Sequence, residues 1–141
     1  AIDDERLTFH PTLWDAEIKQ GQTIKQVWFC GMHTDVGGGY AEQGLSDIAL
    51  AWMVKEATDN GLLIFGANTV VMKSDPDGMM HDSRGGFLEK LYRKKARSWN
   101  AQTHGKPVVH ESVLERTLNK NNMEDPPYAP WILVQTHDVE S

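Results

Sequence analysis

The feature that most constrains the fold is an apolar segment that runs directly into a histidine and a triple glycine. Residues 24–32 are mostly apolar and rich in β-branched and aromatic side chains, which predicts a strand buried on both faces, as in a parallel sheet covered by helices. Gly37, Gly38 and Gly39 disfavour a helix interior, so we expect residues 33–40 to form a loop at the carboxyl end of that strand. This order indicates an α/β protein with its functional residues at that edge of the sheet.

A helix is expected soon after the glycines. Ser46 is a typical helix N-cap with Asp47 in the first turn, and Gly61 is a typical residue just beyond a helix C-terminus. Residues 48–54 are apolar nearly all round, which indicates a helix buried on more than one side. Residues 1–62 are therefore predicted to form a core unit of strand, histidine loop and helix.

The rest of the chain, residues 63–141, is predicted to be a helical and irregular region without a second domain. Turn residues, apolar spacing and prolines predict a short strand within 62–72, a turn at 75–78, a helix over 86–97, a loop over 102–107, a helix capped by Ser112 and an extended tail from 125.

Composition excludes several classes of protein. The 141 residues carry a net charge of −6, which disfavours a nucleic-acid partner, and no stretch is long and apolar enough for a transmembrane helix. The single cysteine, Cys30, excludes an internal disulfide framework and a multi-thiolate zinc site. It lies in an apolar segment and is expected to be a buried core thiol. The basic cluster of Arg93, Lys94, Lys95 and Arg97 is expected to be a solvated helix face.

His33 is the first candidate for a catalytic residue. An imidazole directly after a buried strand is held on a rigid support, and its ordinary pKa near ~6.5 suits proton transfer at neutral pH. A structural histidine that caps a turn is the alternative interpretation. Asp35 is expected to hydrogen-bond its own loop, and Gly37, Gly38 and Gly39 are expected to shape that loop.

Two further hypotheses remain open at this point. Imidazole and carboxylate groups together can bind Zn²⁺ or Mn²⁺, so His33, Asp35, His81 and Asp82 are candidate ligands of a metal-dependent hydrolase. A non-enzymatic interaction module is the other hypothesis. The sequence contains no G-x-S-x-G motif, so the nucleophile of a serine hydrolase would lie outside this chain.

Several motifs together carry a resemblance to a known family. They are Ala1-Ile2-Asp3-Asp4-Glu5-Arg6, Phe9-x-Pro11-x-Leu13-Trp14, Gln26-Val27-Trp28-Phe29-x-Gly31-x-His33-x-Asp35-Val36-Gly37-Gly38-Gly39-Tyr40, and Leu45-Ser46-Asp47-Ile48-Ala49-Leu50-Ala51-Trp52-Met53. The chain resembles the catalytic domain of the type VI secretion phospholipase effectors of the first lipase-effector family. His81-Asp82-Ser83, Glu111-Ser112-Val113-Leu114-x-Arg116 and Tyr128-x-Pro130 are similar to the family's C-terminal part.

The resemblance implies an α/β-hydrolase-like fold, with a mostly parallel sheet flanked by helices, and hydrolysis of lipid acyl esters without a cofactor. It implies that residues 1–141 are the C-terminal portion of that domain, that His33 is the histidine of a catalytic triad, and that the nucleophilic Ser and the acidic Asp lie upstream. The order Ser, Asp, His is the one found in α/β-hydrolases. The implied partners are a phospholipid or other lipid ester, a secretion apparatus and an immunity protein. The implied location is the cytoplasm at synthesis, followed by secretion without a signal peptide.

Overall fold

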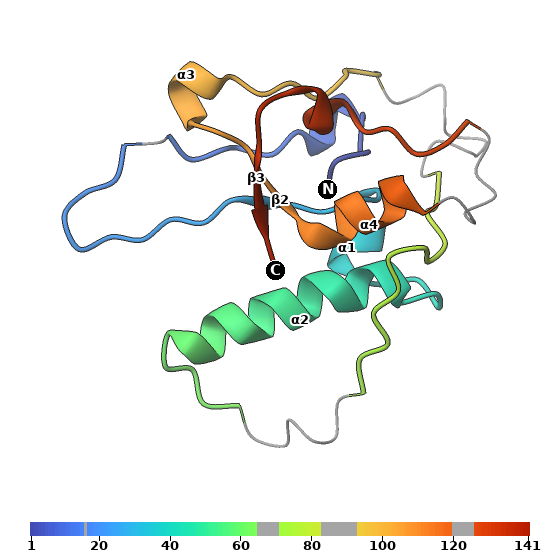
Figure 1. The fold of residues 1–141 in the computed structure, drawn as a ribbon, viewed down its shortest axis with the longest axis horizontal. Coiled ribbons are helices and arrows are strands. Elements are labelled where there is room, and N and C mark those ends of the chain that lie inside the picture. The colour runs from blue at the N-terminus through green and yellow to red at the C-terminus, as the bar shows by residue number, and fades with distance from the viewer. Residues whose placement is uncertain (16, 65–70, 83–92, 120–125) are drawn as a thin grey trace.

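The fold is built on a small parallel sheet. The computed structural model describes residues 1–15, 17–64, 71–82, 93–119 and 126–141. Its strands are β1 (Val27–Trp28), β2 (Val108–His110) and β3 (Asp138–Glu140), in the order β1-β2-β3. Both neighbouring pairs are parallel, with Val27 opposite Val108 and Val108 opposite Asp138. Three segments far apart in the sequence therefore lie side by side at the centre of the molecule (Figure 1).

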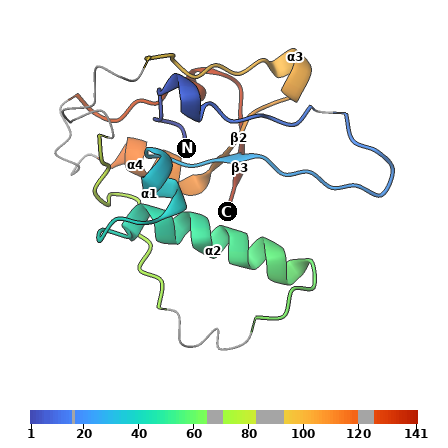
Figure 2. The same cartoon turned by 180° about the vertical axis from the view of Figure 1, so that it is seen from behind.

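Helices lie on both sides of these strands. The long helix α2 lies along one side, whereas α3 and the turn η4 lie on the other in both views (Figures 1 and 2). The α-helices are α1 (His33–Gly37), α2 (Gly44–Asp59), α3 (Ala101–His104) and α4 (Glu111–Leu118), and the 3-10 turns are η1 (Leu7–Phe9) and η4 (Trp131–Val134). The predicted α/β class and the parallel sheet are confirmed.

Two boundaries in the core unit differ from the prediction. The strand is shorter than residues 24–32, and residues 33–37 form the one-turn helix α1 where a loop was expected. Helix α2 begins at Gly44 with Gln43 as its N-cap. Ser46 lies inside the first turn, where its hydroxyl donates to the Gln43 carbonyl oxygen at 3.1 Å. Ser46 therefore bonds back to the helix start from within it.

The C-terminal region, residues 63–141, differs more from its predicted secondary structure. It supplies β2 and β3, which the sequence did not predict, and residues 101–104 form α3 where a loop was expected. The turn at 75–78 is confirmed. Residues 93–97 are extended, with an antiparallel bridge between Arg6 and Lys94, so the predicted helix does not extend over them. The rest of that helix and most of the strand predicted within 62–72 lie outside the described residues.

Helix α4 forms where a helix was expected, but its cap is a different residue. His110 is the N-cap, and its Nδ1 accepts from the Ser112 backbone N–H at 3.3 Å. Ser112 lies in the first turn, and its Oγ is 2.9 Å from the same Nδ1. The side chain of the last β2 residue therefore begins the helix that follows it.

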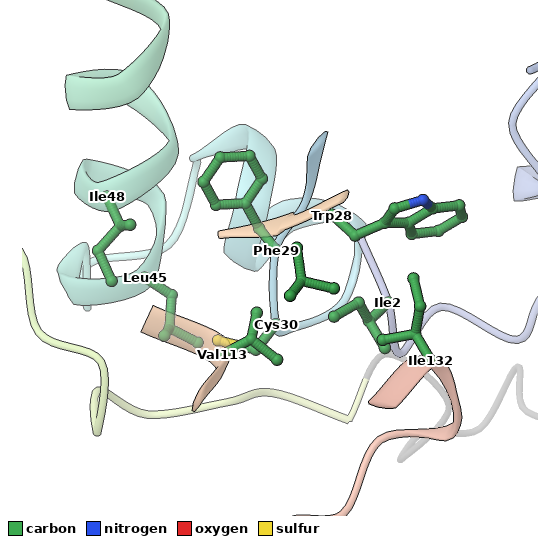
Figure 3. Close-up of a cluster of buried hydrophobic side chains, with 9 residues drawn as sticks. Ile2, Trp28, Phe29, Cys30, Leu45, Ile48, Val113 and Ile132 are labelled. Carbon is green, nitrogen blue, oxygen red and sulfur yellow. The ribbon is translucent and has the colours of Figure 1, made fainter. Parts of the chain in front are cut away.

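A single apolar cluster joins the two sides of the sheet. Leu45 and Ile48 of α2 lie on one side of it, with Ile2 and Ile132 on the other (Figure 3). The cluster comprises Ile2, Trp28, Phe29, Cys30, Leu45, Ile48, Val109, Val113 and Ile132. Cys30 is buried as expected, and burial raises the pKa of its thiol to about 12. This packing holds the end of β1, and with it the start of α1, in a fixed position.

Candidate functional site

His33 begins α1 a few residues after β1 ends. The chain turns sharply at Gly31, whose φ is +105°, and a Cβ there would lie 2.6 Å from the Cβ of Asp35. Only glycine fits this approach of the strand end to the helix. The result is that the His33 side chain is exposed at the edge of the sheet, on a turn anchored to the core.

The His33 imidazole packs against an aromatic ring. Its ring meets the Phe9 ring edge-on, with 5.0 Å between the ring centroids. Within the described ranges, neither ring nitrogen of His33 makes a hydrogen bond or an ion pair. Both nitrogens are therefore available to other groups.

Phe9 is itself held by a buried ion pair. The Arg6 guanidinium lies 3.6 Å from the centroid of the Phe9 ring and donates to both carboxylate oxygens of Asp4, at 2.9 and 2.7 Å. Burial alone would raise the pKa of Asp4, but the hydrogen bonds from Arg6 outweigh it and lower the pKa below its ordinary value. Asp4 and Arg6 thus form an ion pair that is buried and not on the surface.

Asp35 faces inward, although it lies in the same turn as His33. Its buried carboxylate accepts hydrogen bonds from the Met32 backbone N–H at 2.9 Å and from the His81 backbone N–H at 3.1 Å. The other carboxylate oxygen lies 2.7 Å from Nδ1 of His81. The bond to Met32 confirms that Asp35 bonds its own turn, and it caps the first turn of α1.

The glycines divide between the helix and the loop. Gly37 is the last residue of α1, whereas Gly38 and Gly39 have φ values of +83° and +124° and carry the chain out of the helix. A Cβ at Gly39 would lie 3.3 Å from Cγ2 of Thr34. The glycines therefore reverse the chain close to α1, which supports a geometric role.

The metal-ligand candidates come together only in part. Asp35 and His81 are paired, but the His33 ring contacts Phe9, and Asp82 is exposed beside a separate hollow that His81 also lines. No group of three or more His, Cys, Asp or Glu side chains suited to a metal ion occurs in the parts of the chain that the structure describes.

Two residues near the site were not identified from the sequence. Asp3 accepts from the Gly31 backbone N–H at 2.7 Å and from the Tyr128 hydroxyl at 2.9 Å, and burial raises its pKa. Arg97, expected on a solvated face, is buried and donates to the backbone carbonyl oxygens of Ala1, Asp4 and Phe9. These contacts join residues that are 28 to 125 positions apart, and no sequence spacing links them, so they required the tertiary structure.

An apolar hollow adjoins the glycines. It measures about 660 Å³ and extends from Gly37 and Gly38 between β1 and α2. Leu50 and Met53 of α2 line it and are 44% and 56% exposed. The hollow leaves large apolar side chains uncovered next to the His33 turn.

Comparisons with known proteins place part of the chain in a family. No curated protein and no solved structure matches it. Among the described residues, no helix is long and apolar enough to cross a membrane. Residues 1–56 match the family model described as "T6SS, Phospholipase effector Tle1-like, catalytic domain". The segment that carries β1, His33 and most of α2 therefore matches the Tle1-like phospholipase-effector catalytic domain, a family whose fold is α/β-hydrolase-like.

Proposed function

We propose that His33 is the general acid–base residue of a serine hydrolase that cleaves acyl esters of phospholipids. The observation that carries this proposal is the exposed imidazole of His33, which makes no hydrogen bond among the described residues. It lies just after the carboxyl end of a parallel strand, within the segment that matches the phospholipase family. The triad histidine of an α/β-hydrolase occupies a loop late in the chain order, after the Ser and the acid.

The reaction then proceeds by acyl transfer. A serine hydroxyl from a part of the protein outside these 141 residues attacks the ester carbonyl carbon, while a His33 nitrogen takes the hydroxyl proton. The tetrahedral intermediate collapses, and His33 gives that proton to the departing alcohol oxygen. Water then attacks the acyl-enzyme with His33 again as the base, which releases the fatty acid and restores the serine.

Asp35 does not orient His33 in this mechanism. Its carboxylate is buried and already accepts from Met32 and His81. A second carboxylate, also from outside the chain, would hold the other nitrogen of His33 and stabilise the imidazolium. Asp35 and the glycines instead fix the backbone turn from which His33 projects.

We propose that the chain is the C-terminal part of the hydrolase domain and that the remaining part packs against the hollow beside β1 and α2. The exposed Leu50 and Met53 in that hollow support this, because apolar side chains gathered on one surface favour a covering partner. The match to a type VI secretion family also supports export by that apparatus, starting from the cytoplasm, and inhibition by an immunity protein.

The test is fatty-acid release from phospholipid vesicles by the complete gene product that contains these residues. His33→Ala should abolish release, whereas His137→Ala should retain it, because the His137 ring bonds the nearby Gln135 carbonyl oxygen in the C-terminal segment. Undiminished release by the His33→Ala protein would overturn the proposal.

A further inference from the structure

The segment that follows α2 brings a second histidine to the His33 turn. We call residues 73–82 the strap. Its backbone is fixed at several points: the Lys73 N–H donates to Asp47 at 2.7 Å and the Asp75 N–H donates to the Gly44 carbonyl oxygen at 3.1 Å. Arg116 of α4 donates to the carbonyl oxygens of Pro76 and Gly78, at 2.9 and 2.8 Å. The strap is thus bound to both α2 and α4 before it reaches His81.

His81 contacts both ends of the glycine loop. On one side its Nδ1 lies 2.7 Å from the Asp35 carboxylate. On the other side its ring stacks on Tyr40, the residue after the glycines, with 3.7 Å between centroids and 21° between planes. Its Nε2 lies 3.5 Å from a Glu42 carboxylate oxygen. Because a carboxylate only accepts hydrogen bonds, Nδ1 of His81 carries the proton shared with Asp35.

The glycines between these contacts have no side chains that could fix the conformation of the loop. Gly38 and Gly39 lack side chains and have positive φ values, so the backbone there has more accessible conformations than any other sequence would allow. Among the described residues, the His33 ring packs on Phe9 and its nitrogens make no hydrogen bond, so the direction in which it projects depends on the backbone of α1. That backbone is held at its first turn by Asp35, which His81 binds from outside the turn.

We propose that His81 is a positioning residue for His33: through the Nδ1 bond to Asp35 and the stack on Tyr40, it holds the α1 turn in the orientation that proton transfer requires. This rests on the proposed role of His33. His81 touches no reacting atom in this account. Loss of its bond should lower kcat and leave KM nearly unchanged, because misplacing a base affects the chemical step more than substrate binding.

The experiment compares three substitutions of His81 in the complete gene product, measured by phospholipid hydrolysis. His81→Phe keeps a ring on Tyr40 but removes the donor to Asp35. His81→Asn places an amide N–H where Nδ1 lies, and His81→Gln moves it one bond further out. His104→Phe is the matched control, since Nδ1 of His104 also makes a 2.9 Å bond, to the Trp14 carbonyl oxygen, but from α3 on the other side of the sheet.

His81→Phe should lower kcat about tenfold or more, the effect of losing a hydrogen bond to a charged group, with KM within about twofold. His81→Asn should stay within about threefold of wild type, His81→Gln should lie between the two, and His104→Phe should be unaffected.

A wild-type kcat for His81→Phe, with His33→Ala inactive, would overturn the inference and leave the proposed function intact. An active His33→Ala protein would overturn both. If His81→Phe does not fold, the amide pair decides: a higher kcat for Asn than for Gln supports the inference, and equal values overturn it.

Discussion

His33 begins the turn that Asp35 caps, whereas His81 pairs with the Asp35 carboxylate, and the two imidazole rings contact different groups. His33 is exposed, and no described residue hydrogen-bonds its nitrogens. The His81 side chain is 20% exposed, is paired with Asp35 and stacks on Tyr40. Among the described residues, the nitrogens of the first ring have no partner, whereas the second ring is engaged by Asp35 and Tyr40. The difference shows that the role of a histidine near a site depends on the partners of its ring nitrogens and cannot be read from its sequence context alone.

The two largest changes in stability are expected at the Gly31 turn, which precedes His33, and at the Asp4–Arg6 ion pair. Gly31→Ala would place a Cβ 2.6 Å from the Cβ of Asp35 at a φ of +105°, which should cost about 3 kcal/mol of unfolding free energy. Gly37→Ala is the control, since a Cβ there meets nothing within 4 Å. Denaturant unfolding of the two variants measures this difference, and equal stability would show that the turn is not packed as described.

The Arg6–Asp4 ion pair, which packs against Phe9, should make the stability of the region around His33 depend on pH. Asp4→Asn should cost about 3 kcal/mol at pH 7, because it removes the buried carboxylate charge that accepts two hydrogen bonds from the Arg6 guanidinium. Since the folded-state pKa of Asp4 is lowered, its stabilisation is present above the unfolded-state pKa and is lost as the pH falls through the folded value.

Unfolding curves from pH 7 down to pH 2 measure this effect. The wild type and Asp4→Asn should converge as the pH falls. Curves that stay parallel would contradict the assignment.

The stability of the region around His81 should depend on the Asp35 carboxylate. Asp35→Ala leaves the N–H groups of Met32 and His81 and the Nδ1 donor of His81 without their acceptor, which should cost about 2 kcal/mol. Hydrogen exchange should show the loss at the backbone amides of residues 32 and 81. Unchanged protection at both amides would mean that Asp35 does not bind the strap.

The smallest change in stability is expected for His33. Its side chain is exposed, and among the described residues its ring contact is the edge-on one with Phe9, so His33→Gln should change the unfolding free energy by less than about 0.5 kcal/mol. His81→Phe should cost more than that in the same assay. A reversed order would remove the distinction between the free and the engaged imidazole.

Local patterns predicted more of residues 1–62 than of the C-terminal region. The apolar run before His33, the glycines after it and the apolar helix each depend on neighbours in sequence, and their order indicated the α/β class. The loop predicted for residues 33–40 was only partly correct. Asp35 accepts from the Met32 backbone N–H and so caps a helical turn over residues 33–37, which outweighs the unfavourable helix propensity of the glycines.

Contacts between distant residues explain what was missed. β2 and β3 are three residues each and are strands only because they pair with each other and with β1. Asp35 and His81 are 46 residues apart, and their pairing depends on strap bonds to α2 and α4 that no spacing reveals. His33 could be proposed because its signal, a histidine after a strand and before glycines, is local.

The most direct test of the account is kcat for phospholipid hydrolysis by the His33→Gln protein, with the unfolding free energy measured on the same sample. We expect kcat to fall by about a thousandfold or more while the unfolding free energy stays within about 0.5 kcal/mol of wild type, because a triad histidine contributes to the transition state and an exposed ring contributes little to folding. A kcat within about tenfold of wild type, in a protein that is folded, would contradict the assignment of His33 as the acid–base residue.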